Sequence, residues 1–99
     1  MGSSITNENV QGDNVFQIAC RFGRTQIIQL IVDHPEFSAV MNDTNHSGRA
    51  PVHSAAEEGH LKDLNMLLKR GAYLQKDNDG QTPLHLAAEK GHREIVSLI

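Results

Sequence analysis

Apolar residues recur three and four positions apart along much of the chain, which is the spacing of one face of an α-helix. The segment DGQTPLHLAAEKGHREIVSLI, residues 79–99, contains two such stretches separated by Gly91. In the first stretch, the residues expected to face inward are Leu84, Ala87 and Ala88. In the second, the residues expected to begin an apolar helix face are Ile95, Val96, Leu98 and Ile99. The pattern predicts two short helices.

Turn and capping residues bound these predicted helices. Gly80 suits a turn position with positive φ. Thr82 can cap the first helix with its hydroxyl, and Pro83 fits the first helical position because the amide it lacks has no partner there. Gly91 is expected to end the helix in a left-handed conformation. Each unit therefore has the order turn, short helix, short helix.

The same pattern occurs three times. SGRAPVHSAAEEGHLKDLNMLL, residues 47–68, matches residues 79–99 at an offset of 32. GDNVFQIACRFGRTQIIQLIV, residues 12–32, matches residues 47–68 at an offset of 36. The four extra residues follow Val32 in DHPEFSAVMNDTNHSG, where we expect a long loop.

Four of the positions at which the earlier copies depart from the last one bear on the predicted fold. Ala50 lacks the hydroxyl of Thr82, and such a loss of a cap costs about 1 kcal/mol. Asn14 can still cap in the first copy. Asp63 stands where the last copy has Ile95, which predicts either a gap in the apolar face or a polar contact with a neighbour. Cys20 falls on a small, inward-facing position and is expected to be buried.

Composition narrows the class of protein. The 99 residues suffice for one domain, and 38% hydrophobic with 21% charged residues is typical of a folded protein. A net charge of −3 without a basic run disfavours nucleic-acid binding. No apolar run approaches the roughly 20 residues that cross a bilayer, and residues 1–9 lack a secretory signal. A single cysteine favours a reducing compartment.

The clustered histidines and carboxylates could also indicate a metal site or a catalytic site. His53 and His60, like His85 and His92, are seven residues apart, too far for one metal ion, and no other ligand has the spacing of a zinc site. Glu57 and Glu58 are adjacent, so they do not face each other on a helix. A calcium loop centred on Gly80 would need oxygen ligands where Gln75 and Leu86 stand. We predict no catalytic, metal-binding or cofactor-binding residue, and no enzyme.

A period near 33 with a TPLH core resembles the ankyrin repeat. The resemblance implies an all-α solenoid in which each repeat is a β-turn followed by an antiparallel helix pair. About three repeats are expected: a degenerate one with a long loop at 12–46, a second at 47–78, and a truncated third at 79–99. Residues 1–11 are a preceding tail, with MGSS at 1–4 taken as a possible cloning remnant. The resemblance also implies that the histidines bond within the scaffold, near their turns and loops.

The resemblance to ankyrin repeats further implies that the chain binds proteins through a concave face. In that family the face is built from the turn tips and the first helices. By position, that face comprises Thr44, His46, Ser47, Arg49, Glu57, Glu58, Lys76, Asn78, Asp79, Gln81, Glu89 and Lys90. The expected partners are proteins, or neighbouring repeats of a longer parent chain, with no nucleic acid and no membrane insertion, and the expected location is cytoplasmic. Charge reversal at Glu57, Glu58 and Glu89 should weaken binding without unfolding.

A second resemblance concerns the parent protein. LLKRGAYLQKDNDGQTPLH, residues 67–85, and the lengthened loop before it are similar to the ankyrin array of TRPA-type cation channels. The alternatives are therefore a fragment of such a cytoplasmic regulatory array, or a targeting segment of an ankyrin-bearing enzyme. Because no polar capping helix follows residue 99, we expect apolar surface at that end, covered by further repeats or by a partner.

Overall fold

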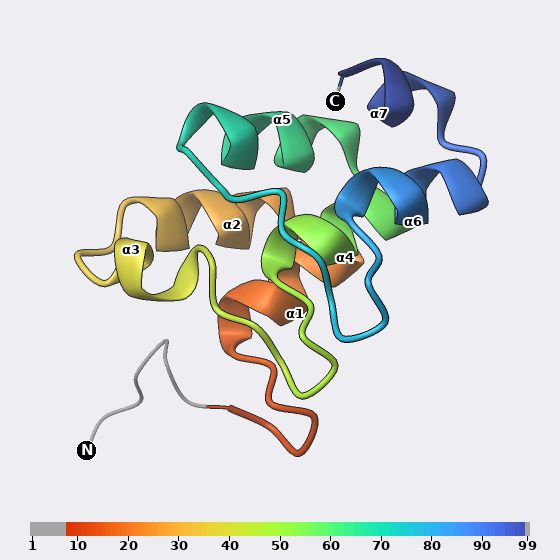
Figure 1. The fold of residues 1–99 in the computed structure, drawn as a ribbon. Helices are drawn as coiled ribbons and strands as arrows, with labels where there is room; N and C mark the ends of the chain where they lie inside the picture. The colour runs from red at the N-terminus through yellow and green to blue at the C-terminus, as the bar shows by residue number, and fades with distance from the viewer. Residues whose placement is uncertain (1–7, 99) are drawn as a thin grey trace.

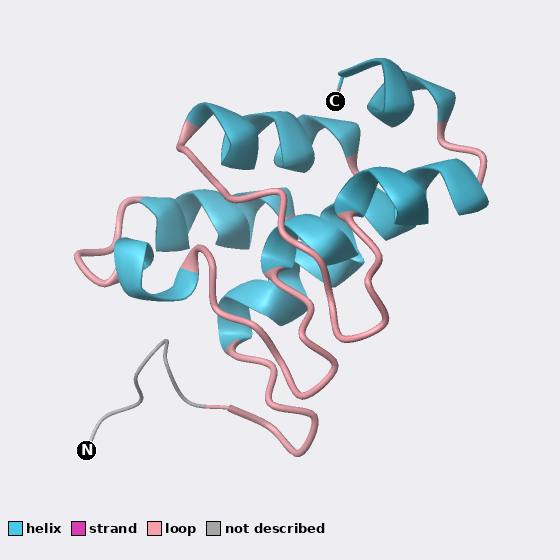
Figure 2. Cartoon of the chain, in the orientation of Figure 1, coloured by secondary structure: helices cyan, strands magenta, loops and turns pink. Residues whose placement is uncertain are grey.

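The computed structural model describes residues 8–98, and within them it contains helices and loops but no strand (Figure 2). The helices are α1 Val15–Phe22, α2 Thr25–Val32, α3 Phe37–Val40, α4 Pro51–Glu58, α5 Leu61–Lys69, α6 Pro83–Glu89 and α7 Arg93–Leu98. No helix in this part of the chain is long and apolar enough to cross a membrane.

The helices form two stacked rows (Figure 1). One row consists of α1, α4 and α6, in which each helix packs against the next. Their sequence successors α2, α5 and α7 form the second row, each packed against its own first helix. The connections before α4 and α6 extend away from the first row as long hairpin-like loops. This arrangement confirms the predicted all-α solenoid of turn-plus-helix-pair units.

The predicted helix ends are confirmed. Asn14 accepts a hydrogen bond from Gln17 N at 2.9 Å, and Gln17 Oε1 accepts from Asn14 N at 2.6 Å, so the pair closes a capping box on α1. Thr82 caps α6 in the same way through the amide of His85. Ala50 provides no such bond to α4, as expected. Gly91 has φ +77°, the left-handed conformation expected after α6.

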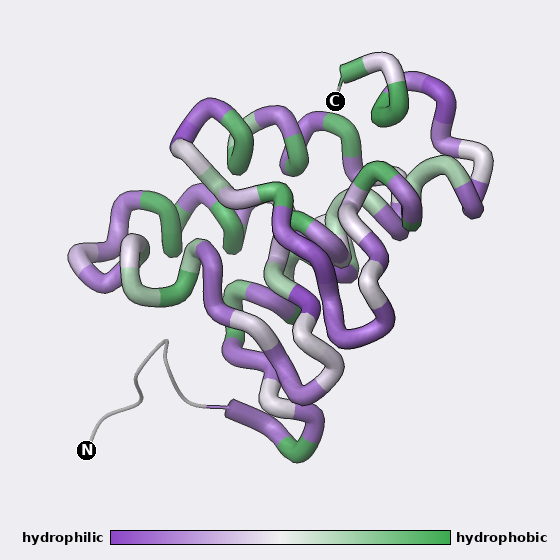
Figure 3. Tube along the Cα trace, viewed as in Figure 1, coloured by the Kyte–Doolittle hydropathy of each residue, from purple (hydrophilic) through white to green (hydrophobic). Residues whose placement is uncertain are grey.

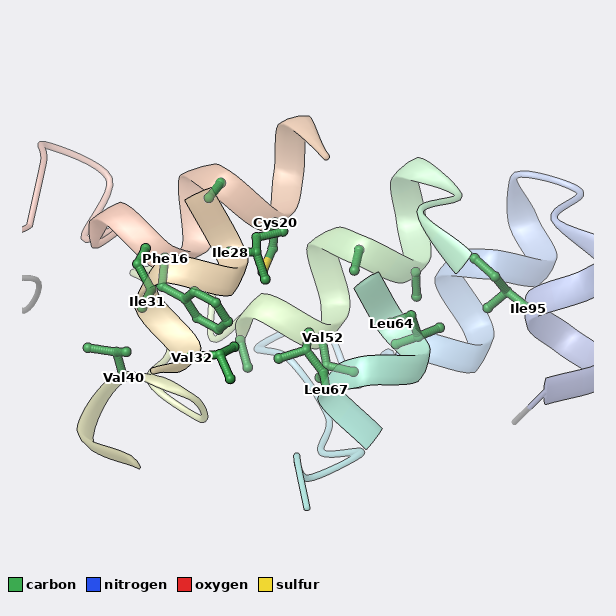
Figure 4. Packing of buried hydrophobic residues seen from close by; sticks show 14 of the residues in the cluster. Phe16, Cys20, Ile28, Ile31, Val32, Val40, Val52, Leu64, Leu67 and Ile95 are labelled. Atoms are coloured by element: carbon green, nitrogen blue, oxygen red, sulfur yellow. The ribbon is translucent and has the colours of Figure 1, made fainter. Parts of the chain in front are cut away.

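One aliphatic core runs the length of the stack (Figure 4). Phe16, Val52 and Leu64 are fully buried, and Cys20 is buried as predicted. Burial raises the pKa of the Cys20 thiol far above its usual range, and the charge of nearby Asp63 adds to the effect. The thiol is therefore a packing group and not a nucleophile.

The inserted segment is not only the long loop that the repeat offset predicted. It contains the single-turn helix α3, which buries Val40 completely and sets the ring of Phe37 edge-on against Phe16, with centroids 5.4 Å apart. Edge-to-face aromatic contacts are favourable beyond the area they bury. The insertion thus closes the core beside α1 and α2.

Two of the residues predicted to face inward are exposed. Leu84 is 39% exposed and Ala88 is exposed, whereas Val52 and Ala56 at the matching positions of the second repeat are fully buried. The difference arises because α6 covers the far side of α4, whereas within residues 8–98 no further first-row helix packs against the far side of α6. The buried residues of α6 are therefore Pro83, Leu86 and Ala87.

The second predicted helix face of the last unit is only partly buried. Ile95 is buried, but Val96 and Leu98 are 40% and 38% exposed. Ile99 lies outside the described residues, as do Met1–Ser4, so their expected roles stay predictions. The exposed apolar surface at this end, expected from the missing cap, is thus present on α6 and α7.

Candidate interaction surface

Histidines join each second helix to the repeat before it. His60 lies against Gly23, and its Nε2 is 3.0 Å from the carbonyl oxygen of Arg21. His92 repeats the contact against Gly59, with its Nε2 2.8 Å from the carbonyl oxygen of Glu57. These two histidines are part of the scaffold, as predicted, but their side chains bond to the end of the preceding repeat's first helix.

The loop tips are joined in register as well. Asn78 donates from its backbone N to Ser47 O at 3.0 Å and from its side chain to His46 O at 2.9 Å. His46 N donates in turn to Gln11 O, in the loop before α1, at 2.9 Å. His46 and Asn78 belong to the predicted binding face, yet they also hold neighbouring loops together.

An ion pair connects the loop and the first helix within each of the first two repeats. Arg21 Nη2 lies 2.7 Å from Asp13 Oδ2, and Arg49 Nη1 lies 2.9 Å from Glu57 Oε1. The positions correspond, but the acid and the base have exchanged places. The predicted site residues Arg49 and Glu57 are therefore half-buried and already partnered.

Asp77 links the loop before α6 to the loop before α4, and it was not predicted as a site residue. Its Oδ2 accepts from Arg49 Nε at 3.1 Å, and its Oδ1 accepts from the amides of Asp79 and Gln81, both at 2.9 Å. Burial acts to raise the pKa of Asp77, but these hydrogen bonds outweigh it and hold the pKa below its usual value. The Asp-Asn-Asp-Gly string was the only sequence signal, and it indicates a turn.

His53 is the one buried group that lacks a full set of partners among the described residues. Its Nδ1 accepts from Ala50 N at 3.0 Å, while its Nε2 has no hydrogen-bond partner. Burial lowers the pKa of His53, although the nearby carbonyl groups of Gln81 and Gln75 oppose the shift. Gln17 occupies the same position in the first repeat, so the position serves the cap and not a reaction.

Asp63 makes the polar contact that its register predicted. It is buried, and its Oδ1 accepts from Thr25 Oγ1 of the preceding repeat at 3.1 Å. No group of three or more His, Cys, Asp or Glu side chains within residues 8–98 is placed to hold a metal ion.

Most of the predicted face residues are exposed at the loop tips and along the first helices. The polar loops that carry many of them are evident in Figure 3. The exposed members are Thr44, His46, Ser47, Glu58, Lys76, Asn78, Asp79, Glu89 and Lys90, and the half-buried ones are Arg49, Glu57 and Gln81. Within the part of the chain that the structure describes, Glu58, Lys76, Asp79, Glu89 and Lys90 take part in no ion pair.

One residue of this surface was missed. Phe22 ends α1 at the position that Glu58 and Lys90 occupy in the later repeats, and its side chain is 56% exposed. The offset of 36 residues could have identified it. Its apolar ring makes the first repeat's part of the face different in chemistry from the charged parts beside it.

Comparison with known proteins agrees with this architecture. Residues 1–78 match the family described as "Ankyrin repeats (3 copies)", and residues 79–99 match "Ankyrin repeat". Ankyrin repeats are generally non-catalytic modules for protein interaction.

Three relatives illustrate how such repeats are distributed. The ADP-ribosylation factor GTPase-activating protein AGD4 of Arabidopsis thaliana is 31% identical over 70 residues, which are 71% of this chain and 9% of that protein. The transient receptor potential cation channel subfamily A member 1 of Drosophila melanogaster is 31% identical over 51 residues, 52% of this chain and 4% of the channel. The Homo sapiens channel of that name is 29% identical over 76 residues, 77% of this chain and 7% of the channel.

The chain thus spans less than a tenth of the length of each of these relatives. The similarity to TRPA channels predicted from the loops is confirmed as a similarity. The stacked helix pairs, the glycine–histidine contacts between them and the family matches over both parts of the sequence lead to one conclusion: this chain belongs to the ankyrin repeat family.

Proposed function

We propose that the chain binds a protein partner through its concave face. The observation that carries the proposal is a row of exposed side chains that differ from repeat to repeat and have no ion-pair partner within residues 8–98: Glu58, Lys76, Asp79, Glu89 and Lys90. Hydrogen bonds between repeats hold the backbone beneath them, so these side chains are presented on a rigid support.

The partner should offer a basic segment beside an apolar group. Glu58 and Glu89 carry uncompensated negative charge on α4 and at the end of α6, and Phe22 offers an exposed ring on α1. An aromatic anchor supplies binding energy, and charges around it set specificity and association rate. We place this module in the cytoplasm, where a single reduced cysteine is stable.

The test uses charge reversal, and the residues are chosen so that no ion pair of the structure is broken. Glu57 is left intact because its reversal would break the bond to Arg49. Peptides selected from a displayed library against the wild-type chain are measured for affinity to E58K/E89K. The matched control is D33K/E94K, which makes the same change in net charge at exposed residues of the second helix row.

The expected result is weaker binding by E58K/E89K, on the order of tenfold, with little change in the control. Equal losses in both variants, or none in either, would refute the concave face as the binding surface.

A second candidate function is a segment of a longer array, such as the cytoplasmic regulatory array of a TRPA-type channel or the targeting repeats of an ankyrin-bearing enzyme. The observation that favours it is the similarity to short stretches of much longer proteins, two TRPA channels and an ADP-ribosylation factor GTPase-activating protein. Sequencing the full-length transcript decides between parents: transmembrane spans of about 20 apolar residues identify a channel, and their absence beside a catalytic domain identifies an enzyme.

A further inference from the structure

Three cationic side chains line a groove between α2 and α5, in the second helix row. Lys62, Lys69 and Arg70 line it and are all exposed. None of them forms an ion pair within residues 8–98, because the three ion pairs found there engage only Arg21 and Arg49. In a chain of net charge −3, such a concentration of unpaired cations is a local reversal of sign.

Carboxylates do not neutralise the groove. Its single acid, Asp63, is buried and accepts a hydrogen bond from Thr25 Oγ1, so three cations and one carboxylate leave a nominal charge of +2. Asp33 and Glu94 occupy positions in the neighbouring repeats that match Lys69 and Lys62. Neither lines the groove or pairs with these cations.

Helix electrostatics account for only part of the cluster. Lys69 and Arg70 lie at the C-terminal end of α5, where a cation interacts favourably with the helix dipole. Lys62 lies in the first turn, where the dipole disfavours a cation. The helix dipole therefore does not account for the position of Lys62, and the groove holds cations at both ends of the helix.

We propose that this groove binds a compact polyanion with at least two phosphate groups. Lys62 and Lys69 are seven residues apart, about 10 Å along the helix axis, so separate phosphates of one ligand can reach the two ends. Gln29 and Asn65 line the groove between them and offer amide donors. Met66 is the only apolar side chain in the lining, which disfavours a peptide, because peptide binding depends on buried apolar anchors.

The test is a titration of the folded chain with inorganic tripolyphosphate. Binding is measured by isothermal titration calorimetry and by changes in amide chemical shifts. The variant K62Q/K69Q removes two groove cations, and K62Q alone isolates the lysine that the dipole disfavours. The matched control K76Q/K90Q removes two exposed lysines on the concave side. Circular dichroism verifies that each variant is folded, and orthophosphate serves as the single-phosphate comparison.

We expect saturable binding that perturbs the amides of Thr25 and Gln29 and weakens at high ionic strength. K62Q/K69Q should weaken it on the order of tenfold, K62Q by a smaller factor, and the control by less than about twofold. The proposal is overturned if the wild-type chain does not bind tripolyphosphate, if orthophosphate binds as tightly, or if the control loses as much affinity as K62Q/K69Q.

Discussion

The contact between Gly59 and His92 provides a sharp test of how the repeats hold together. Gly59 has φ +80°, and a Cβ built there would lie 2.8 Å from His92 Cε1. An alanine pays about 1–2 kcal/mol for the left-handed conformation, offset by about 0.4–1 kcal/mol from the less flexible unfolded chain. It must also displace the imidazole, and the bond to Glu57 O that would be lost is worth about 0.5–1.5 kcal/mol.

Gly91 is the internal control for this calculation. It has nearly the same backbone conformation, φ +77°, but a Cβ there meets nothing within 4 Å. We expect Gly91→Ala to cost only the backbone penalty, about 1 kcal/mol. Gly59→Ala should cost about 1 kcal/mol more, measured as the free energy of unfolding in urea.

A double-mutant cycle separates the clash with His92 from any other destabilisation of the last repeat, such as local unfolding. In a His92→Ala background the imidazole is absent, so Gly59→Ala should lose its excess cost and keep only the backbone term. The two substitutions would then be coupled by about 1 kcal/mol. If their effects add to within about 0.3 kcal/mol, the histidine is not what restricts this position to glycine.

Two further substitutions test the helix cap and the buried imidazole. Ala50→Thr copies the cap of Thr82 and should raise the free energy of unfolding by about 1 kcal/mol; a urea midpoint at or below that of the wild type would contradict this. Burial lowers the pKa of His53 below its ordinary 6.5, so the unfolded chain takes up a proton first and stability falls as the pH drops below about 6.5. His53→Gln, which copies Gln17, should lose less stability than the wild type between about pH 7 and pH 5, a window that excludes Asp77 because its lowered pKa lies below 3.8. Equal pH slopes for the two proteins would exclude His53 as the titrating group.

Features that depend on residues close in sequence were predicted correctly, whereas features that depend on contacts between distant residues were not. Asn14 and Gly91 were read correctly because a cap and a left-handed residue depend on neighbours only a few positions away. The single turn of α3 was missed because its packing depends on residues distant in sequence: the ring of Phe37 lies against Phe16, and Val40 is buried in the core. Leu84 was misassigned because the helix pattern identifies an apolar face without indicating whether another repeat covers it.

The same distinction between local and distant contacts applies to the candidate surface. Register alone placed Glu58, Asp79 and Lys90 at exposed positions, since equivalent residues of a repeat take equivalent places. It could not show that Arg49 is held by both Glu57 and Asp77, because Asp77 lies 28 residues farther along the chain, in the loop before α6.

The repeat, the order of turn and helices, and the family were predictable from the residues alone, because they follow from local spacing and residue type. Which charges remain unpaired became clear only in the folded stack. Ion pairing depends on distances across the stack: these bring Arg49 to Asp77, leave Glu58 exposed, and gather Lys62, Lys69 and Arg70 at one groove.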